Sequence, residues 1–176
     1  MHRNLWLFLP LAVLALFVAA VAWRLSAPPD STVHSQLVGQ PVPAFSLESA
    51  VPSKPAFASA DLVGGGPKLL NLFASWCVPC IAEAPTLAEL RQQGVTIDGI
   101  AVRDAPSDIA KFLRENGDPY RRIGADPRSQ AQMALGSSGV PESFVVDGRG
   151  VIRYQHIGPI MPQDVPAILA ELEKAR

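Results

Sequence analysis

Cysteine and histidine are scarce in this chain. Only two of its 176 residues are cysteine and three are histidine. Two cysteines cannot form the several bridges of a small disulfide-rich scaffold, nor a zinc site with four cysteine ligands. The sequence also lacks internal repeats, which excludes repeat architectures. A fold of this length has to depend on a hydrophobic core, for which the chain is long enough.

An excess of charge of one sign is also lacking. Fifteen lysine and arginine residues stand against 16 aspartate and glutamate residues, for a formal charge of −1 at pH 7. A nucleic-acid-binding protein needs an excess of cations that displaces counterions from phosphates. Charged residues make up 18% of the sequence, below the roughly one quarter that is usual in soluble proteins. One segment accounts for much of that deficit.

This segment is Leu5–Trp23, a run of 19 residues without a charge. As a helix it would be roughly 29 Å long, about the hydrocarbon thickness of a bilayer. Trp6 and Trp23 stand near its ends, where aromatic rings favour the membrane interface. We expect an uncleaved membrane anchor. A cleaved signal peptide is one alternative, since Ala20-Val21-Ala22 offers a cleavage pattern, and a buried helix of a soluble protein is the other.

Composition divides the chain into three segments. Residues 1–24 are the predicted N-terminal membrane anchor. Residues 25–40 are polar, contain Pro28-Pro29-Asp30 and are predicted to form a tether. Residues 41–176 form one domain, which is expected to be exported whether the anchor is kept or removed.

Apolar runs and helix breakers predict the elements of this domain. Gly64–Pro67 is a break, and Lys68–Ala74 after it has the continuous apolar pattern of a central strand. Further strands are expected over 43–47 and 95–102, with a hairpin over 144–146 and 151–154, and 51–60 is expected as loop. Helices are expected from the cysteine motif to about Gln93, over 106–116 and 129–135, and through Val165, Ile168, Leu169 and Leu172. This order predicts an α/β fold with a mixed central sheet flanked by helices.

The two cysteines, Cys77 and Cys80, form a C-x-x-C pair with three interpretations. A structural bridge over so short a loop would remove little entropy from the unfolded chain. Half of a metal site would need two further ligands, but His2 lies before the anchor, His34 lies in the tether and His156 is interpreted as an ordinary hairpin residue. No metal is therefore expected. Thiol–disulfide exchange is favoured, because the pair lies between a strand and a helix.

The start of a helix suits this exchange chemistry. Free N–H groups and the helix dipole would favour a thiolate at Cys77. Pro79 falls in the first turn, where its missing N–H costs nothing. Cys80 lies one turn further on, in position to attack a mixed disulfide. We therefore interpret Cys77 as the attacking thiol and Cys80 as the resolving thiol, while Trp76 either shields one side of the pair or simply packs.

These residues resemble the thioredoxin fold, whose signature is a W-C-x-P-C motif between strand and helix. A second matching element, Gly139-Val140-Pro141-Glu142-Ser143-Phe144, follows the motif later in the chain. In thioredoxin-like proteins the matching proline is cis and lies against the cysteines, so the resemblance implies a cis Pro141. An isolated X-Pro bond would usually be trans. The backbone beside a cis Pro141 would offer an edge with which a substrate segment could pair.

The chain is more closely similar to the membrane-anchored thiol:disulfide proteins of cytochrome c biogenesis, the CcmG/DsbE type. The likeness runs through most of 39–158 and rests on Leu70–Cys77, Ala82–Pro85, Gly117–Tyr120, Val140–Asp147 and Ile152–Gly158. The stretch Ser137-Ser138-Gly139-Val140 departs from the family, in which an aromatic residue and an alanine often precede the proline. This loop would line the substrate groove.

Two positions distinguish this type from ordinary thioredoxin. Asn71 stands where thioredoxin has a buried carboxylate, and asparagine cannot take up a proton. The resemblance places Glu83 beside the cysteines, where it would hold or relay the proton of Cys80. Its charge would also raise the pKa values of the cysteines and slow unspecific exchange. Alternatively, Glu83 is a solvated helix residue.

The resemblance implies a reductase on the periplasmic side of the bacterial inner membrane. Its electrons would go to apocytochrome c or to another thiol protein of cytochrome c maturation, and a membrane thiol reductase would restore its dithiol. Residues 5–23 would contact the lipid bilayer, nucleic acid would not be a partner, and no cofactor beyond the two sulfurs would be needed. A general thiol oxidase or isomerase and a non-catalytic chaperone for apocytochrome stay open as alternatives.

Overall fold

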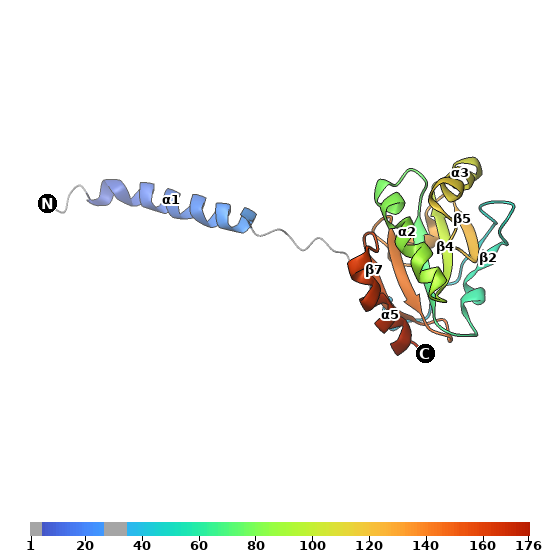
Figure 1. Cartoon of the computed structure of the whole chain (residues 1–176). Coiled ribbons are helices and arrows are strands. Elements are labelled where there is room, and N and C mark those ends of the chain that lie inside the picture. The colour runs from blue at the N-terminus through green and yellow to red at the C-terminus, as the bar shows by residue number, and fades with distance from the viewer. Residues whose placement is uncertain (1–4, 27–34) are drawn as a thin grey trace. The chain divides into compact units, whose positions relative to one another are not determined.

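The structure is a computed structural model that describes residues 5–26 and 35–176. The chain divides into two units, one with helix α1 (Leu5–Ser26) and one with all other elements (Figure 1). From Leu9 to Trp23, the large apolar side chains of α1 are exposed. Within the described ranges, no helix combines the length and the apolar character that a membrane crossing demands.

The second unit alternates strands and helices along the chain. Its elements are β1 (Ser46–Leu47), β2 (Phe57–Ala58), the 3-10 helix η1 (Ser59–Leu62), β3 (Lys68–Phe73), α2 (Val78–Gln92), β4 (Thr96–Val102), α3 (Pro106–Asn116), β5 (Arg122–Asp126), α4 (Gln130–Ala134), β6 (Glu142–Val146), β7 (Ile152–Ile157), the 3-10 helix η2 (Pro162–Asp164) and α5 (Val165–Lys174). Gly94 and Gly117 follow α2 and α3 with φ of 90° and 95°. This left-handed conformation favours glycine at a helix end.

A five-stranded sheet in the order β5-β4-β3-β6-β7 forms the centre of the domain. The pairs β3–β4 and β4–β5 are parallel, whereas β3–β6 and the hairpin β6–β7 are antiparallel. β3 is therefore the central strand, and all of its residues are buried. The predicted α/β fold with a mixed central sheet flanked by helices is confirmed.

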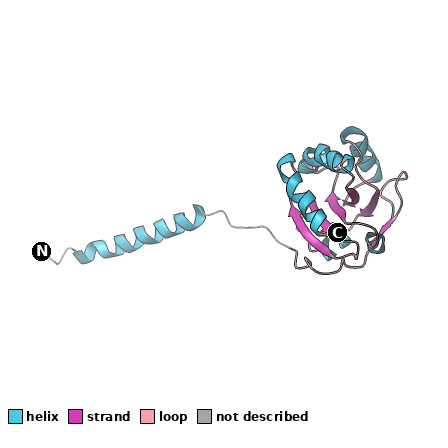
Figure 2. Cartoon of the chain, turned by 60° about the horizontal axis from the view of Figure 1, so that its bottom comes forward, coloured by secondary structure: helices cyan, strands magenta, loops and turns pink. Residues whose placement is uncertain are grey.

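Alternating side chains of β3 separate two apolar layers. Leu69 and Phe73 belong to the layer that they share with α2, α3 and α5, and Figure 1 shows α2 and α5 over this face. Leu70 and Leu72 belong to the opposite layer, which η1, α4 and the N-terminal part of the domain complete. Figure 2 shows the strands with helices packed around them.

The N-terminal part of the domain covers both edges of this sheet. Residues 39–42 bond to residues 150–152 at the start of β7, with N···O distances of 2.7–3.0 Å. Residues 48–50 bond to residues 123–125 of β5, with N···O distances of 2.9 Å. Uncovered edge strands would present open backbone groups to other chains.

Part of the predicted tether belongs to the domain. The Ser35 amide donates to Gln155 Oε1 (2.6 Å), and the Ser35 hydroxyl donates to the Leu135 carbonyl (2.8 Å). The domain therefore includes residues 35–40, whereas the sequence predicts its start at residue 41. The rest of the predicted tether that precedes Ser35, residues 27–34 with His34, lies outside the described residues, as does His2.

Two strands differ from the sequence-based expectation. No strand is predicted at β5, which contains one large apolar side chain, and a loop is predicted where β2 lies. Both owe their burial to distant partners. A Cβ at Gly124 of β5 would come within 2.7 Å of Leu47, and Phe57 of β2 packs edge-on against Phe45 with ring centroids 5.3 Å apart.

Candidate active site

The two cysteines lie where β3 passes into α2. Cys77 is the N-cap residue of α2, and Pro79 lies in the first turn, as the sequence predicts. Cys77 and Cys80 form a disulfide with their Cα atoms 5.2 Å apart. The Cys80 amide donates both to the Cys77 carbonyl (3.0 Å) and to Cys77 Sγ (3.2 Å). The helix start therefore gives the Cys77 sulfur the Cys80 N–H as a hydrogen-bond donor, which, with the helix dipole, stabilises negative charge there.

The disulfide is buried, and an exposed apolar rim surrounds it. Cys77 is 4% exposed and Cys80 1%, whereas Trp76, Val78 and Ile81 around them are 56%, 73% and 41% exposed. A second polypeptide can therefore contact the rim before it reaches a sulfur, and Cys77 is the more accessible of the two cysteines. An exposed apolar patch of this kind is typical of an interaction site.

Three hydrogen bonds to the two residues that follow β4 fix the segment that leads into the disulfide. Asp104 accepts hydrogen bonds from the Ser75 amide (2.6 Å) and the Ser75 hydroxyl (2.8 Å). The Trp76 indole N–H donates to the Arg103 carbonyl (3.2 Å). The indole N–H of Trp76 is thus held by a hydrogen bond while its ring stays exposed. Neither Arg103 nor Asp104 is singled out by the sequence, because their contacts are made across 27 to 29 residues of chain.

A buried polar network joins β3 to α2, the helix that begins at the disulfide. Asn71 Nδ2 donates to Glu83 Oε1 (3.0 Å) and to Ser143 Oγ (3.0 Å). The Tyr120 hydroxyl donates to Asn71 Oδ1 (2.8 Å), and the Ile160 amide donates to Glu83 Oε2 (2.9 Å). The structure therefore joins Asn71 and Glu83, both predicted as site residues, and adds three residues that sequence reasoning missed. Tyr120 and Ser143 lie in stretches that carry the family likeness, which is the one signal that points to them.

The Glu83 side chain is fully buried, so the alternative of a solvated helix residue is wrong. Burial raises the pKa of the Glu83 carboxyl to about 7, against hydrogen bonds from Ile160 and Asn71 that lower it. Burial also raises the pKa of Tyr120 well above its usual value, with a further contribution from the charge of Glu83. Glu83 can therefore hold or release a proton near neutral pH, whereas Tyr120 stays a hydrogen-bond donor.

The Val140–Pro141 peptide bond is cis, which confirms the predicted isomer of Pro141. Pro141 directly precedes β6, where Glu142 pairs with Leu72 near the end of β3. This register brings the proline to the same end of the sheet as the segment that leads to Cys77. Glu142 accepts hydrogen bonds from Ser137 Oγ (2.7 Å) and the Ser138 amide (3.0 Å), which fold the preceding loop back onto β6.

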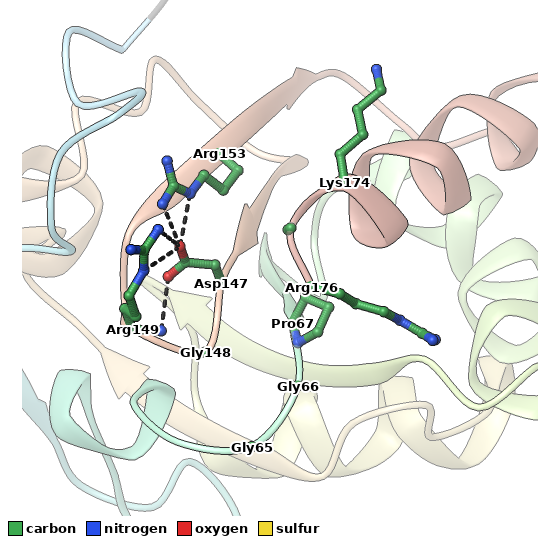
Figure 3. A pocket seen from close by; sticks show the side chains of 10 residues that line it. Gly65, Gly66, Pro67, Asp147, Gly148, Arg149, Arg153, Lys174 and Arg176 are labelled. Atoms are coloured by element: carbon green, nitrogen blue, oxygen red, sulfur yellow. Dashed lines mark hydrogen bonds and ion pairs between the residues drawn. The ribbon is translucent and has the colours of Figure 1, made fainter.

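A separate cavity of about 680 Å³ lies at the turn between β6 and β7 and contains neither cysteine (Figure 3). Figure 3 shows Asp147 between Arg149 and Arg153, and Arg153 Nη2 lies 2.6 Å from Asp147 Oδ2. Although burial acts to raise the pKa of Asp147, hydrogen bonds from Val151, Arg153 and Arg149 hold it at about 2. The cations of this cavity are thus committed to carboxylates of the same chain.

Comparison with known proteins gives a consistent result. Residues 37–172 match the Redoxin family. The chain is 42% identical over 154 residues to the thiol:disulfide interchange protein HelX of Rhodobacter capsulatus, covering 88% of this chain and 87% of the relative. It is 36% identical over 162 residues to the thiol:disulfide interchange protein DsbE of Escherichia coli K12, covering 89% of this chain and 87% of the relative.

A solved structure supports the same fold. The thiol:disulfide interchange protein of the thioredoxin family from Chlorobium tepidum TLS superimposes with a TM-score of 0.62 at 26% identity. The match covers 81% of this chain and 98% of that structure. The resemblance to the thioredoxin fold is thereby confirmed for the domain.

Proposed function

We propose that this chain, which belongs to the Redoxin family, is the reductant of protein disulfides in the maturation of c-type cytochromes. It is a thiol:disulfide oxidoreductase, because its relatives are thiol:disulfide interchange proteins and its C-x-x-C pair forms a disulfide at a helix start. That placement of Cys77 is the observation that carries the proposal.

The reaction begins from the dithiol form. The Cys77 thiolate attacks one sulfur of the substrate disulfide, forms a mixed disulfide with it and expels the other sulfur as a thiolate, which takes up a proton. Cys80 then loses its proton and attacks Cys77 Sγ. The second substrate thiolate leaves and is protonated, and the Cys77–Cys80 disulfide forms. Two electrons pass from the enzyme to the substrate, so no cofactor enters the balance.

Glu83 supports the reducing direction and the second step. It lies three residues after Cys80 on α2, and side chains at this spacing are neighbours on a helix. As a base it would accept the Cys80 proton when the mixed disulfide is resolved. As an anion it disfavours a nearby thiolate, which makes the dithiol form a stronger electron donor.

The proposed partners follow from the resemblance in the sequence. Electrons go to the C-x-x-C-H cysteines of apocytochrome c or to another thiol protein of that maturation, and a membrane thiol reductase regenerates the Cys77–Cys80 dithiol. Cys77 with its exposed apolar rim offers an approach to another chain, and an oxidising compartment creates the need for such a reductase.

We also place the domain in the bacterial periplasm, held at the inner membrane by the N-terminal segment. The support is the uncharged run Leu5–Trp23. Because no described helix qualifies as a membrane crossing, attachment needs a direct test. After cell fractionation, the full chain should stay with membranes washed at alkaline pH and keep Met1. Release into the periplasmic fraction with a new N-terminus would indicate a cleaved signal instead.

A trapping experiment tests the reaction and names the substrate. In a bacterium that lacks its own protein of this type, Cys80→Ala should accumulate a mixed disulfide at Cys77 that dithiothreitol releases. Mass spectrometry of the trapped chain should find an apocytochrome or a maturation thiol protein. Cys77→Ser should abolish c-type cytochromes, and normal assembly in this variant would contradict the proposal.

Two further results separate the alternatives. The double variant Cys77→Ala/Cys80→Ala should also fail to support cytochrome assembly, whereas a chaperone would tolerate the change. The reduction potential of the pair should lie well below the roughly −120 mV of a strong thiol oxidant. A value near that figure would favour an oxidase.

A further inference from the structure

Beside the disulfide lies a groove of about 580 Å³, which we call the α4 groove because α4 forms one of its walls. It reaches from Trp76, the residue before Cys77, to Val140, the residue before the cis Pro141. A polypeptide whose disulfide engages Cys77 can therefore place its flanking residues in this groove.

Cations without acidic partners line the α4 groove. Arg103 and Arg128 are both exposed lining residues, and no lining residue is acidic. Over the part of the chain that the structure describes, neither guanidinium makes an ion pair. The Arg128 side chain has one distant contact, 3.4 Å from Gln130 Oε1. Both arginines are thus available to a carboxylate from outside.

The carboxylates nearest to these arginines in the sequence already accept other hydrogen bonds. Asp104 binds the Ser75 amide and hydroxyl and the Ala105 amide. Asp126 accepts hydrogen bonds from the Gln130 amide (2.8 Å) and the Gln132 amide (2.9 Å). These hydrogen bonds hold Asp126 at the end of β5 and Asp104 in the loop after β4, so that neither carboxylate pairs with Arg103 or Arg128.

Ser129 adds an unpaired polar group to the wall of the groove, independently of the arginines. It lines the groove, is 8% exposed, and its hydroxyl oxygen is buried with no hydrogen-bond partner among the described residues. An unpaired buried hydroxyl destabilises a fold unless something else satisfies it. Arg103 and Ser129 also have φ of 49° and 55° and are the only non-glycine residues with positive φ in the described chain. Such conformations tend to persist at functional positions.

Apolar surface completes the groove. Trp76 and Met133 are 56% and 65% exposed, and both are lining residues. We propose that the α4 groove recognises the substrate polypeptide by an acidic side chain next to its reactive cysteines, with an apolar neighbour on Trp76 and Met133. The carboxylate binds Arg103 and Arg128. This inference rests on the proposed reductase function and adds a substrate class to it.

Two peptides with an intramolecular C-x-x-C disulfide test this selectivity. Both carry leucine beside the cysteines, and one carries glutamate where the other carries glutamine. The reduced full chain is mixed with each, and the rate of peptide reduction is measured by acid quench and mass spectrometry. At about 20 mM NaCl the glutamate peptide should react about fivefold faster, and the ratio should approach one at about 500 mM NaCl.

Charge variants test whether the groove causes the ratio of the two peptide reduction rates. Arg103→Gln/Arg128→Gln should bring it to about one, and Arg128→Glu alone should favour the glutamine peptide. Arg91→Gln is the matched control, because it removes one exposed cation near the far end of α2 and should keep the wild-type ratio. Equal rates in the wild type, or an unchanged ratio in both groove variants, would overturn the inference and leave the reductase function standing. Failure to reduce either peptide would instead reject the proposed function.

Discussion

A single buried carboxyl makes the stability of this protein depend on pH. The Glu83 pKa is about 7 in the folded chain, against 4.5 for a free carboxyl. Between these values the folded state binds more protons than the unfolded state, so the free energy of unfolding falls as pH rises from about 4.5 to 7. The decrease should reach about 3 kcal/mol above pH 8.

We expect Glu83→Gln to remove this decrease, as urea unfolding of the oxidised full chain at several pH values would show. The slope of the free energy of unfolding against pH is the relevant quantity, because glutamine also disturbs the hydrogen bond from Ile160 at every pH. Glu89→Gln, an exposed position on the same helix, should keep the wild-type slope. Parallel curves for wild type and Glu83→Gln would contradict the raised pKa.

Tyr120 holds the network through one hydroxyl. Tyr120→Phe keeps the ring stacked on Phe73, with centroids 4.7 Å apart, but leaves Asn71 Oδ1 without its donor. We expect a loss of about 1–2 kcal/mol in the free energy of unfolding. Tyr154→Phe, at a half-buried position, is the control and should change stability less. Equal losses in both variants would show that the hydroxyl of Tyr120 is not specifically required.

Individual site residues were predictable where their signal is local. Cys77, Cys80 and Pro79 stand within one turn, and the stretch around Pro141 carries its own likeness to the family. Tyr120, Ser143 and the Ile160 amide reach Asn71 or Glu83 from 49, 72 and 77 residues away. No pattern in the sequence encodes a hydrogen bond across that distance, so only the folded chain reveals the network.

At the scale of elements, β4 needs a glycine where the aromatic rings pack. A Cβ on Gly99 would come within 2.9 Å of the Tyr120 ring and 3.0 Å of the Phe73 ring. Because neither ring can move freely in the core, Gly99→Ala should lower the free energy of unfolding by about 1–3 kcal/mol. Thermal unfolding measures this change. Gly66→Ala, which has open space around it, should be nearly neutral, and a neutral Gly99→Ala would refute the close packing.

Elements with strong internal patterns were predictable, and those that depend on neighbours were not. β3 and α5 carry their apolar pattern within one segment, and Pro106 and Gly117 mark both ends of α3. β5 reads Arg-Ile-Gly-Ala-Asp and becomes a strand because β4 pairs with one side of it and residues 48–50 with the other. These partners bury β5, and its own sequence has no apolar pattern from which this burial could be predicted.

For the whole molecule, acid should lower the free energy of unfolding as alkali does, but through a different carboxyl. The pKa of Asp147 is about 2, so its ion pairs contribute stability above the unfolded value of 3.8 that is lost as pH falls toward 2. Together with Glu83, this predicts maximal stability at about pH 4–5. Asp147→Asn should reduce the loss in the free energy of unfolding as pH falls from about 4 to 2. The exposed control Asp108→Asn should show the same loss as the wild type. If Asp147→Asn lost as much stability in acid as the wild type, this loss would have another cause than Asp147.

The coverage of both sheet edges by residues 39–42 and 48–50 has a consequence for handling the protein. One short stretch of chain keeps these lengths of β7 and β5 from docking onto strands of a neighbouring molecule. Proteolytic cleavage within this stretch would expose both edges of the sheet at once. The cleaved domain would then be prone to self-association even with Cys77 and Cys80 intact.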